Sequence, residues 1–154
     1  PEPEASAPRP PAPEGLSGDA ILSRLTELLP EGLTVKESGK QEAEYAYVVV
    51  DDGQGKSFVQ INVQPGMSDV AATLFGSDAE VLDDGTKVVT HQGPGEKGGA
   101  GVKMKEVDTI RPDGLRVVIS AFNAANQNKA ASREEPALTL DQLKKIATSE
   151  VWVG

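Results

Sequence analysis

The chain contains no cysteine, which excludes disulfides, thiolate metal sites and cysteine nucleophiles. Its one histidine, His91, is too few for an ordinary zinc site, and no Gly-x-Ser-x-Gly nucleophile elbow accompanies it to suggest a serine triad. No run of residues approaches the roughly 20 apolar positions of a membrane-spanning helix. The sequence therefore indicates no catalytic residue, no metal ligand and no cofactor.

Positive charge is also scarce. The chain has 15 Lys and Arg residues against 24 Asp and Glu residues, for a net charge of -9. An acidic protein repels phosphate groups unless it carries a dense basic patch. The most basic short segments, at Lys103 and Lys105 and at Lys144 and Lys145, are both flanked by acidic residues. We therefore expect no nucleic-acid partner and no direct attraction to an anionic membrane surface.

Aromatic residues make up 4% of the chain, so a hydrophobic core must be built from Val, Leu, Ile and Ala. The length of 154 residues suits one ordinary domain. Charged residues make up 25%, close to the average of globular proteins, so most of the chain is expected to fold.

Residues 1–15 are the exception. They read PEPEASAPRPPAPEG, are rich in proline and contain no large apolar side chain. Such a segment cannot bury enough surface to fold, and it predicts a disordered, extended spacer. The chain also begins at Pro1 rather than Met, which we interpret as the loss of an upstream segment. We expect residues 1–15 to be a stalk leading to a membrane anchor, with a frayed end or cloning remnant as the alternative, and residues 16–154 to form one domain.

Helix signals stand at both ends of this domain. The N-cap residue Ser17, followed by an apolar stripe of helical spacing, predicts an N-terminal helix. A capping box formed by Thr139 and Gln142 predicts a C-terminal helix, and Trp152 after it is expected to close the hydrophobic core. Residues 68–75 are also consistent with a short helix.

Between the helices, apolar and polar residues alternate in several runs, as in half-buried strands. Asp-Gly between alternating runs is a strong hairpin signal, because both residues adopt positive φ angles cheaply. Three such pairs are present, at Asp52-Gly53, Asp84-Gly85 and Asp113-Gly114. The polar residues 123–136 predict a long exposed connection. Together these signals predict an α+β fold: an antiparallel sheet of about five to seven strands built from Asp-Gly hairpins, with the N-terminal and C-terminal helices packed on it.

The glycine-rich segment 93–101 reads GPGEKGGAG. Its G-x-G-x-x-G spacing matches a dinucleotide-binding fingerprint, but the residues after it read as a strand where that motif needs the start of a helix. It also lacks the Gly-Lys-Ser/Thr ending of a P-loop. We interpret it as a flexible connection between strands. Because function concentrates in such loops, it is also a candidate binding loop, formed by Gly95, Glu96, Lys97 and Gly98.

Two pairs of adjacent acidic residues, Asp51-Asp52 and Asp83-Asp84, are the best carboxylate candidates for a hydrolase. Each pair precedes a glycine, where turn geometry explains it fully. Neither pair has the spacing of a calcium-binding loop. A carboxylate-dependent hydrolase is therefore the least favoured function.

Three segments carry a resemblance to known proteins: LDDGTKVVTHQGPG at 82–95, RPDGLRVVISAFNA at 111–124 and EPALTLDQLKKIATSEVW at 135–152. They resemble the extracytoplasmic domains of actinobacterial, streptomycete-like single-pass membrane proteins or lipoproteins of unassigned function. The shared pattern is an Asp-Gly hairpin, a Val-rich strand that ends near an aromatic residue and Asn, and a helix followed by Trp. The resemblance covers about half of the chain and implies an extracytoplasmic, tethered location rather than a reaction.

We therefore expect a non-catalytic extracytoplasmic, membrane-tethered binding or sensory domain. Its expected partner is another protein or a cell-envelope component, and its contact with a membrane is expected only through an upstream anchor. The first alternative is a small-molecule or lipid carrier, which would enclose a large apolar cavity. The second is the hydrolase, which would require acidic side chains that converge in a cleft.

Overall fold

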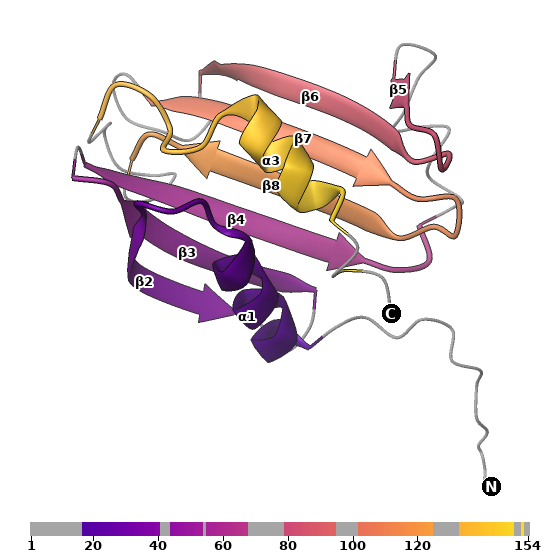
Figure 1. The fold of residues 1–154 in the computed structure, drawn as a ribbon, viewed down its shortest axis with the longest axis horizontal. Helices are drawn as coiled ribbons and strands as arrows, with labels where there is room; N and C mark the ends of the chain where they lie inside the picture. Colours follow the sequence, from indigo (N-terminus) through magenta and orange to yellow (C-terminus); the bar gives the residue numbers. More distant parts are fainter. Residues whose placement is uncertain are drawn as a thin grey trace, which may run out of the picture.

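The computed structural model describes residues 17–40, 44–53, 55–67, 79–94, 102–124, 133–149 and 152. Within these ranges the chain forms a seven-stranded antiparallel sheet and two helices, so the α+β fold class is confirmed (Figure 1). Three predictions lie outside the described residues: the stalk at 1–15, the short helix at 68–75 and the binding loop at 95–98. In chain order the elements are α1 (Gly18–Leu28), β2 (Thr34–Lys40), β3 (Tyr45–Asp51), β4 (Lys56–Gln64), β5 (Glu80–Val81), β6 (Lys87–Pro94), β7 (Lys103–Ile110), β8 (Arg116–Phe122) and α3 (Leu140–Ala147).

The sheet consists of two antiparallel meanders that lie side by side. β2, β3 and β4 are consecutive neighbours, and so are β5, β6, β7 and β8. The meanders meet where β4 pairs with β8, which sets Val59 opposite Ala121 and Ile61 opposite Ile119. The resulting order, β2-β3-β4-β8-β7-β6-β5, joins the two halves of the chain through one continuous sheet.

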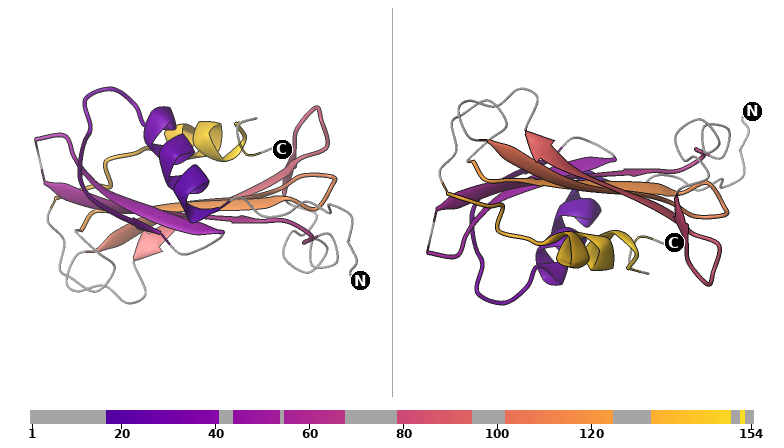
Figure 2. Two further views of the ribbon diagram at one scale, coloured as in Figure 1. Left: turned by 90° about the horizontal axis from the view of Figure 1, so that it is seen from below. Right: turned by 90° about the horizontal axis from the view of Figure 1, so that it is seen from above.

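Both helices pack on the same face of the sheet (Figure 2). α1 contacts β2 and β3, whereas α3 contacts β7 and β8. Neither of these helices is long and apolar enough to cross a membrane, and the described residues contain no other candidate span. The core between the helices and the sheet is formed by Ile21, Leu25, Ala46, Val48, Val50, Val59, Ile61, Val63, Val88, Val107, Val117, Ile119, Ala121, Leu138, Leu143, Ile146, Ala147 and Trp152.

Side-chain caps fix where each helix begins. Ser17 Oγ accepts a backbone hydrogen bond at 3.1 Å from the first turn of α1. At α3, Thr139 Oγ1 accepts from the Gln142 N–H at 3.1 Å and Gln142 Oε1 accepts from the Thr139 N–H at 2.9 Å, which completes a capping box. Trp152 is 1% exposed, and its Nε1 donates to the Ile146 carbonyl at 2.8 Å. The expectation that Trp152 closes the core is therefore confirmed.

The three Asp-Gly segments form turns that are each closed by an aspartate. In every case a carboxylate oxygen accepts a hydrogen bond from the backbone N–H two residues later: Asp51 from Gly53 at 2.7 Å, Asp84 from Thr86 at 2.9 Å and Asp113 from Leu115 at 3.0 Å. The glycines adopt the left-handed backbone that favours this residue, with φ of 97°, 90° and 91° at Gly53, Gly85 and Gly114. These turns are therefore stabilised by contacts within a few residues.

In the described part of the chain, no helix covers the opposite face of the sheet. A row of aromatic rings lies on this face, with centroid distances of 6.4 Å from Tyr45 to Tyr47, 5.3 Å from Tyr47 to Phe58 and 5.8 Å from Phe58 to Phe122. Tyr45 Oη donates to Gln60 Oε1 at 3.1 Å, and burial raises the pKa of Tyr45. Phe58 and Phe122 are buried and belong to a second, smaller core on this face, against which Tyr47 packs.

Two predictions about connections need correction. Residues 123–136 are predicted to be exposed, but Asn123, Ala124 and Pro136 are buried at the two ends of this segment. The burial is possible because backbone groups satisfy the Asn123 side chain. The glycine-rich connection also begins later than predicted, because β6 continues to Pro94.

Candidate binding site at the start of β7

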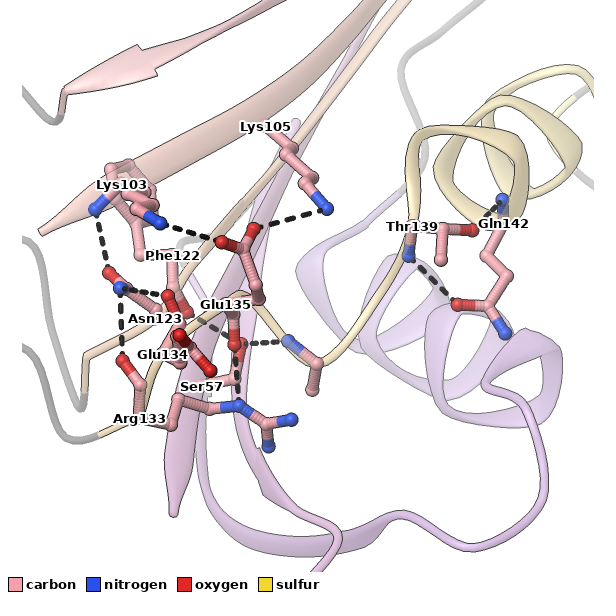
Figure 3. Close-up of polar contacts among 11 residues, drawn as sticks. Ser57, Lys103, Lys105, Phe122, Asn123, Arg133, Glu134, Glu135, Thr139 and Gln142 are labelled. Carbon is pink, nitrogen blue, oxygen red and sulfur yellow. Dashed lines mark hydrogen bonds and ion pairs between the residues drawn. The ribbon is translucent and has the colours of Figure 1, made fainter. Parts of the chain in front are cut away.

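One end of the sheet brings together segments that are far apart in the sequence. Because neighbouring strands are antiparallel, β4 and β7 begin at this end, and β6 and β8 finish there. Residues 133–139 pass this end and lead into α3 (Figure 3). Three polar side chains hold this segment in place, and we call Ser57, Asn123 and Arg133 the clasp.

Asn123 lies directly after β8 and uses both ends of its side-chain amide. Its Oδ1 accepts from the Lys103 N–H at 2.7 Å. Its Nδ2 donates to the carbonyls of Arg133 and Glu134 at 3.0 and 3.1 Å. Because Asn123 is only 1% exposed, these bonds satisfy backbone groups that would otherwise need water. Asn123 therefore fixes the start of segment 133–139 beside the start of β7.

Ser57 in β4 is fully buried and joins three segments through one hydroxyl. Its Oγ donates to the Phe122 carbonyl at 2.6 Å and accepts from the Ala137 N–H at 3.0 Å. A hydroxyl group can donate and accept at the same time, and a serine side chain needs little room. Ser57 therefore connects β4, β8 and the residues that precede α3.

Arg133 completes the clasp with its guanidinium group. Nη1 and Nη2 donate to the two carboxylate oxygens of Asp52 at 2.7 and 3.0 Å, a bidentate ion pair. Nη1 also donates to the Gly55 carbonyl at 3.1 Å, and Nε donates to the Glu135 carbonyl at 2.5 Å. These contacts fix the backbone of Glu135 against the connection between β3 and β4.

The Glu135 side chain lies between two lysines of β7 (Figure 3). Its Oε2 is 2.6 Å from Lys103 Nζ, and its Oε1 is 3.6 Å from Lys105 Nζ. The hydrogen bond from Lys103 is the main cause that lowers the pKa of Glu135, and the same hydrogen bond raises the pKa of Lys103. Both side chains of this closer pair are 50% exposed, so solvent screens the pair and it adds little to stability.

A hollow of about 260 Å³ lies beside these charges. We call it the lysine pocket, and its described lining consists of Gln92, Gly93, Lys103, Met104, Lys105 and Glu135. Lys105 is the most buried charged side chain of this lining, at 19% exposure against 50% for Lys103. Among the described residues, the 3.6 Å ion pair with Glu135 is the one polar contact of the Lys105 ammonium. The lysine pocket therefore contains a partly buried lysine side chain whose ammonium has a single, long ion pair.

The predicted loop residues Gly95, Glu96, Lys97 and Gly98 lie outside the described residues. The two strands that lead into and out of this loop are β6 and β7. They supply five of the six described residues that line the lysine pocket. The predicted loop therefore connects two strands that line the lysine pocket, and the loop itself lies outside the described residues.

Sequence reasoning missed the clasp and Glu135. The sequence marks Lys103 and Lys105 only as a short basic segment, but their spacing of two on a strand is a signal that places both on one face. No local signal connects Glu135 with them, because it lies 32 residues from Lys103 in the chain.

The acidic pairs considered for a hydrolase do not converge. Asp51 and Asp52 lie at the connection between β3 and β4, whereas Asp83 and Asp84 precede β6 at the opposite end of the sheet. His91 is exposed on β6, away from both pairs. Within the ranges that the structure describes, no group of three or more acidic or histidine side chains could hold a metal ion.

Comparison with known proteins assigns no family to this site. No protein-family model, no curated protein and no solved structure matches the chain. The chemistry of the site is therefore inferred from the geometry and charge of its own residues.

Proposed function

We propose that the chain is a non-catalytic binding or sensory domain, tethered to a membrane on its extracytoplasmic side, that binds a protein or a cell-envelope component at the lysine pocket. The observation that carries this proposal is the Lys105 side chain, which lines the pocket at 19% exposure and whose ammonium has one ion pair, at 3.6 Å. A lysine ammonium carries three donors, and one long ion pair leaves them available to an acidic partner. A ligand in the lysine pocket would supply that partner.

The clasp supports a binding role because it holds the pocket wall in a fixed position. Binding sites work best when their side chains are supported by rigid elements and by further hydrogen bonds. Here β7 carries the lysines, while Asn123 and Arg133 donate hydrogen bonds to the backbone carbonyls of Glu134 and Glu135. The geometry of the pocket is therefore set before a ligand arrives, which lowers the entropy cost of binding.

A carrier is less well supported by the packing. The space between the helices and the sheet, where a carrier would need a large apolar cavity, is filled by side chains such as Leu25, Leu143 and Trp152, each at most 1% exposed. A hollow of about 240 Å³ does lie between the helices, lined by Leu28, Pro30, Gln142, Lys145 and Ile146. Its volume is below the range of about 300–1,000 Å³ that is usual for pockets that hold drug-sized ligands.

The tethered location is supported by sequence features. Residues 1–15 have the composition of a stiff spacer, which suits a domain that must reach away from a surface. The resemblance of the C-terminal segments to actinobacterial extracytoplasmic domains is consistent with the same location. Digestion by a protease added to intact host cells would support the proposal, whereas full protection that ends only on lysis would contradict it.

We also propose that the Asp-Gly pairs specify the hairpins of the sheet and that the two terminal helices form on it. The supporting contacts are the aspartate hydrogen bonds within each turn and the side-chain caps at Ser17 and Thr139. In this view the turns set the strand register, and the register brings Gln92 opposite Lys105 at the pocket.

Photo-crosslinking in the intact host tests the proposed binding site. A benzophenone amino acid would replace Gln92, which is exposed at the lysine pocket. The matched control would place the same group at Lys36, which is exposed on the edge strand β2. We expect an adduct with an envelope component from position 92 and none from position 36. No adduct at position 92, or equal adducts at both positions, would contradict the proposal.

A further inference from the structure

The lysine pocket has the charge and the donors of an anion site. Resting on the binding function proposed above, we infer that it takes the acidic head group of a ligand, a carboxylate or a phosphate, and that the ammonium of Lys105 binds that group. The inference follows from the charge balance, the donor arrangement and the volume of the pocket.

The charge balance of the pocket favours an anion. Two ammonium groups, on Lys103 and Lys105, face one carboxylate, on Glu135. Lys103 makes the close contact at 2.6 Å, and it is also influenced by the charge of Glu134. Lys105 is left with the 3.6 Å contact, too long for a hydrogen bond. The described lining therefore carries one net positive charge in a protein whose net charge is -9.

The donors of the pocket also suit an anion. Lys103 and Lys105 are two residues apart on β7, so their side chains project from the same face of the strand. Gln92 of β6 lies directly opposite Lys105 in the register, and its side-chain amide can donate as well. A carboxylate or phosphate is rich in acceptor oxygens and binds best to such charged donors.

The volume of the pocket limits the size of the bound group. At about 260 Å³ it is smaller than the usual site for a whole drug-sized molecule. The pocket therefore fits one acidic group and a few neighbouring atoms, while the remainder of a larger ligand would extend past the exposed Gln92.

An NMR titration with two small anions tests this inference. Uniformly ¹⁵N-labelled protein would be titrated separately with sodium phosphate and with sodium acetate, while sodium chloride keeps the ionic strength constant. We expect saturable shifts of the backbone amides of Gln92, Lys103 and Lys105 with at least one anion. The anion that binds more tightly identifies the head group as phosphate or carboxylate. Shifts that grow linearly without saturation, or that spread evenly over the surface, would overturn the inference.

A pair of charge-matched variants makes the test specific. Lys105→Met keeps the apolar length of the side chain and removes the charge, and Lys36→Met makes the same change on β2. We expect Lys105→Met to weaken anion binding at least about tenfold, the loss of one charged hydrogen bond, while Lys36→Met leaves it unchanged. Lys105→Arg should retain binding. An unchanged affinity in folded Lys105→Met, checked by its amide spectrum, would also overturn the inference.

The same variants separate this inference from the proposed function. If the domain binds a partner at the pocket without an acidic group, the crosslink from position 92 persists in Lys105→Met and neither anion gives saturable shifts. If the proposed function fails and the anion site is real, the shifts saturate and no crosslink forms from position 92.

Discussion

The Asp-Gly turns and the clasp use polar contacts in two different ways. In the turns, an aspartate bonds to a backbone N–H two residues away, and the contacts of Asp51 and Asp113 are exposed. In the clasp, the contact of Ser57 with Phe122 spans 65 residues of the chain and is buried. Water can replace a lost partner in an exposed turn, but it cannot easily reach a buried one. Loss of a clasp contact should therefore lower the free energy of unfolding more than loss of a turn contact, although the turns are easier to recognise in the sequence.

The two regions also have different consequences for the site. The turns join strands that are already neighbours in the chain, so they influence register locally. The clasp positions Glu135, which lies between the lysines, and Ala137, two residues before the N-cap of α3. A change in the clasp should therefore affect both the stability of the fold and the lysine pocket. Changes in a turn should lower stability and leave the pocket intact.

The largest effect is expected for Asn123→Ala. The substitution leaves the Lys103 N–H and the carbonyls of Arg133 and Glu134 without this partner in a partly buried place. We expect the free energy of unfolding, measured with urea, to fall by about 3 kcal/mol. The control is Asn62→Ala, since Asn62 of β4 is partly exposed, and its loss should be less than about 1 kcal/mol. Equal losses of unfolding free energy in the two variants would show that the contacts of Asn123 stabilise the fold no more than those of a partly exposed strand residue.

A smaller effect is expected for Ser57→Ala. The change removes the hydroxyl from both the Phe122 carbonyl and the Ala137 N–H but creates almost no cavity. We expect unfolding measurements to show a loss of about 2 kcal/mol, together with amide shifts at Ala137. Ser38→Ala, on the exposed strand β2, should change neither quantity. A stable Ser57→Ala variant with an unchanged spectrum would contradict the role given to this hydroxyl.

The features that could be predicted from sequence are those whose contacts are local. The α+β class and its antiparallel sheet are confirmed. The capping box of Thr139 and Gln142 is visible as a pattern of two residues three apart, and both of its hydrogen bonds are present. In the Asp-Gly turns the sequence pattern leaves details open: Asp51, rather than Asp52, accepts the hydrogen bond that closes the first turn. Asp52 instead pairs with Arg133, 81 residues away.

The site could not be predicted because its contacts are formed by tertiary structure. Ser57 looks like an ordinary polar residue in a strand, and only the approach of the Phe122 carbonyl and the Ala137 N–H gives it a role. Asn123 looks like the start of an exposed connection, whereas its amide is buried between β7 and segment 133–139. Polar residues that are buried by distant segments carry no periodic signal in the sequence.

The turns are tested by Gly53→Ala, whose effect should be smaller than those of the clasp variants. Gly53 has a φ of 97°, and a Cβ atom added there would meet no atom within 4 Å. The cost is therefore backbone strain alone, and we expect about 1 kcal/mol in the unfolding free energy. Gly93→Ala is the control, because Gly93 lacks a left-handed φ and also has open space around it. The Gly93→Ala variant should lose no unfolding free energy. Anion binding at the lysine pocket should be retained in Gly53→Ala.

The smallest effect on stability is expected for Glu135→Gln, and this effect should depend on pH. The hydrogen bond from Lys103 lowers the pKa of Glu135, so the charged carboxylate stabilises the fold above the ordinary glutamate pKa. This contribution is lost as the pH falls through the lowered pKa of the folded state. The same contact raises the pKa of Lys103, so its contribution is present below the ordinary lysine pKa and is lost as the pH rises through the raised value.

Urea midpoints of the parent protein and Glu135→Gln should therefore differ slightly at neutral pH and converge as the pH falls below the lowered pKa of Glu135, where both side chains are neutral. Glu27→Gln on the exposed face of α1 controls for the general effect of removing one acid. Because the lysine pocket gains net positive charge in Glu135→Gln, anion binding should become tighter while the fold becomes slightly less stable. A stabilised variant with weaker anion binding would show that Glu135 supports the ligand rather than competing with it for Lys105.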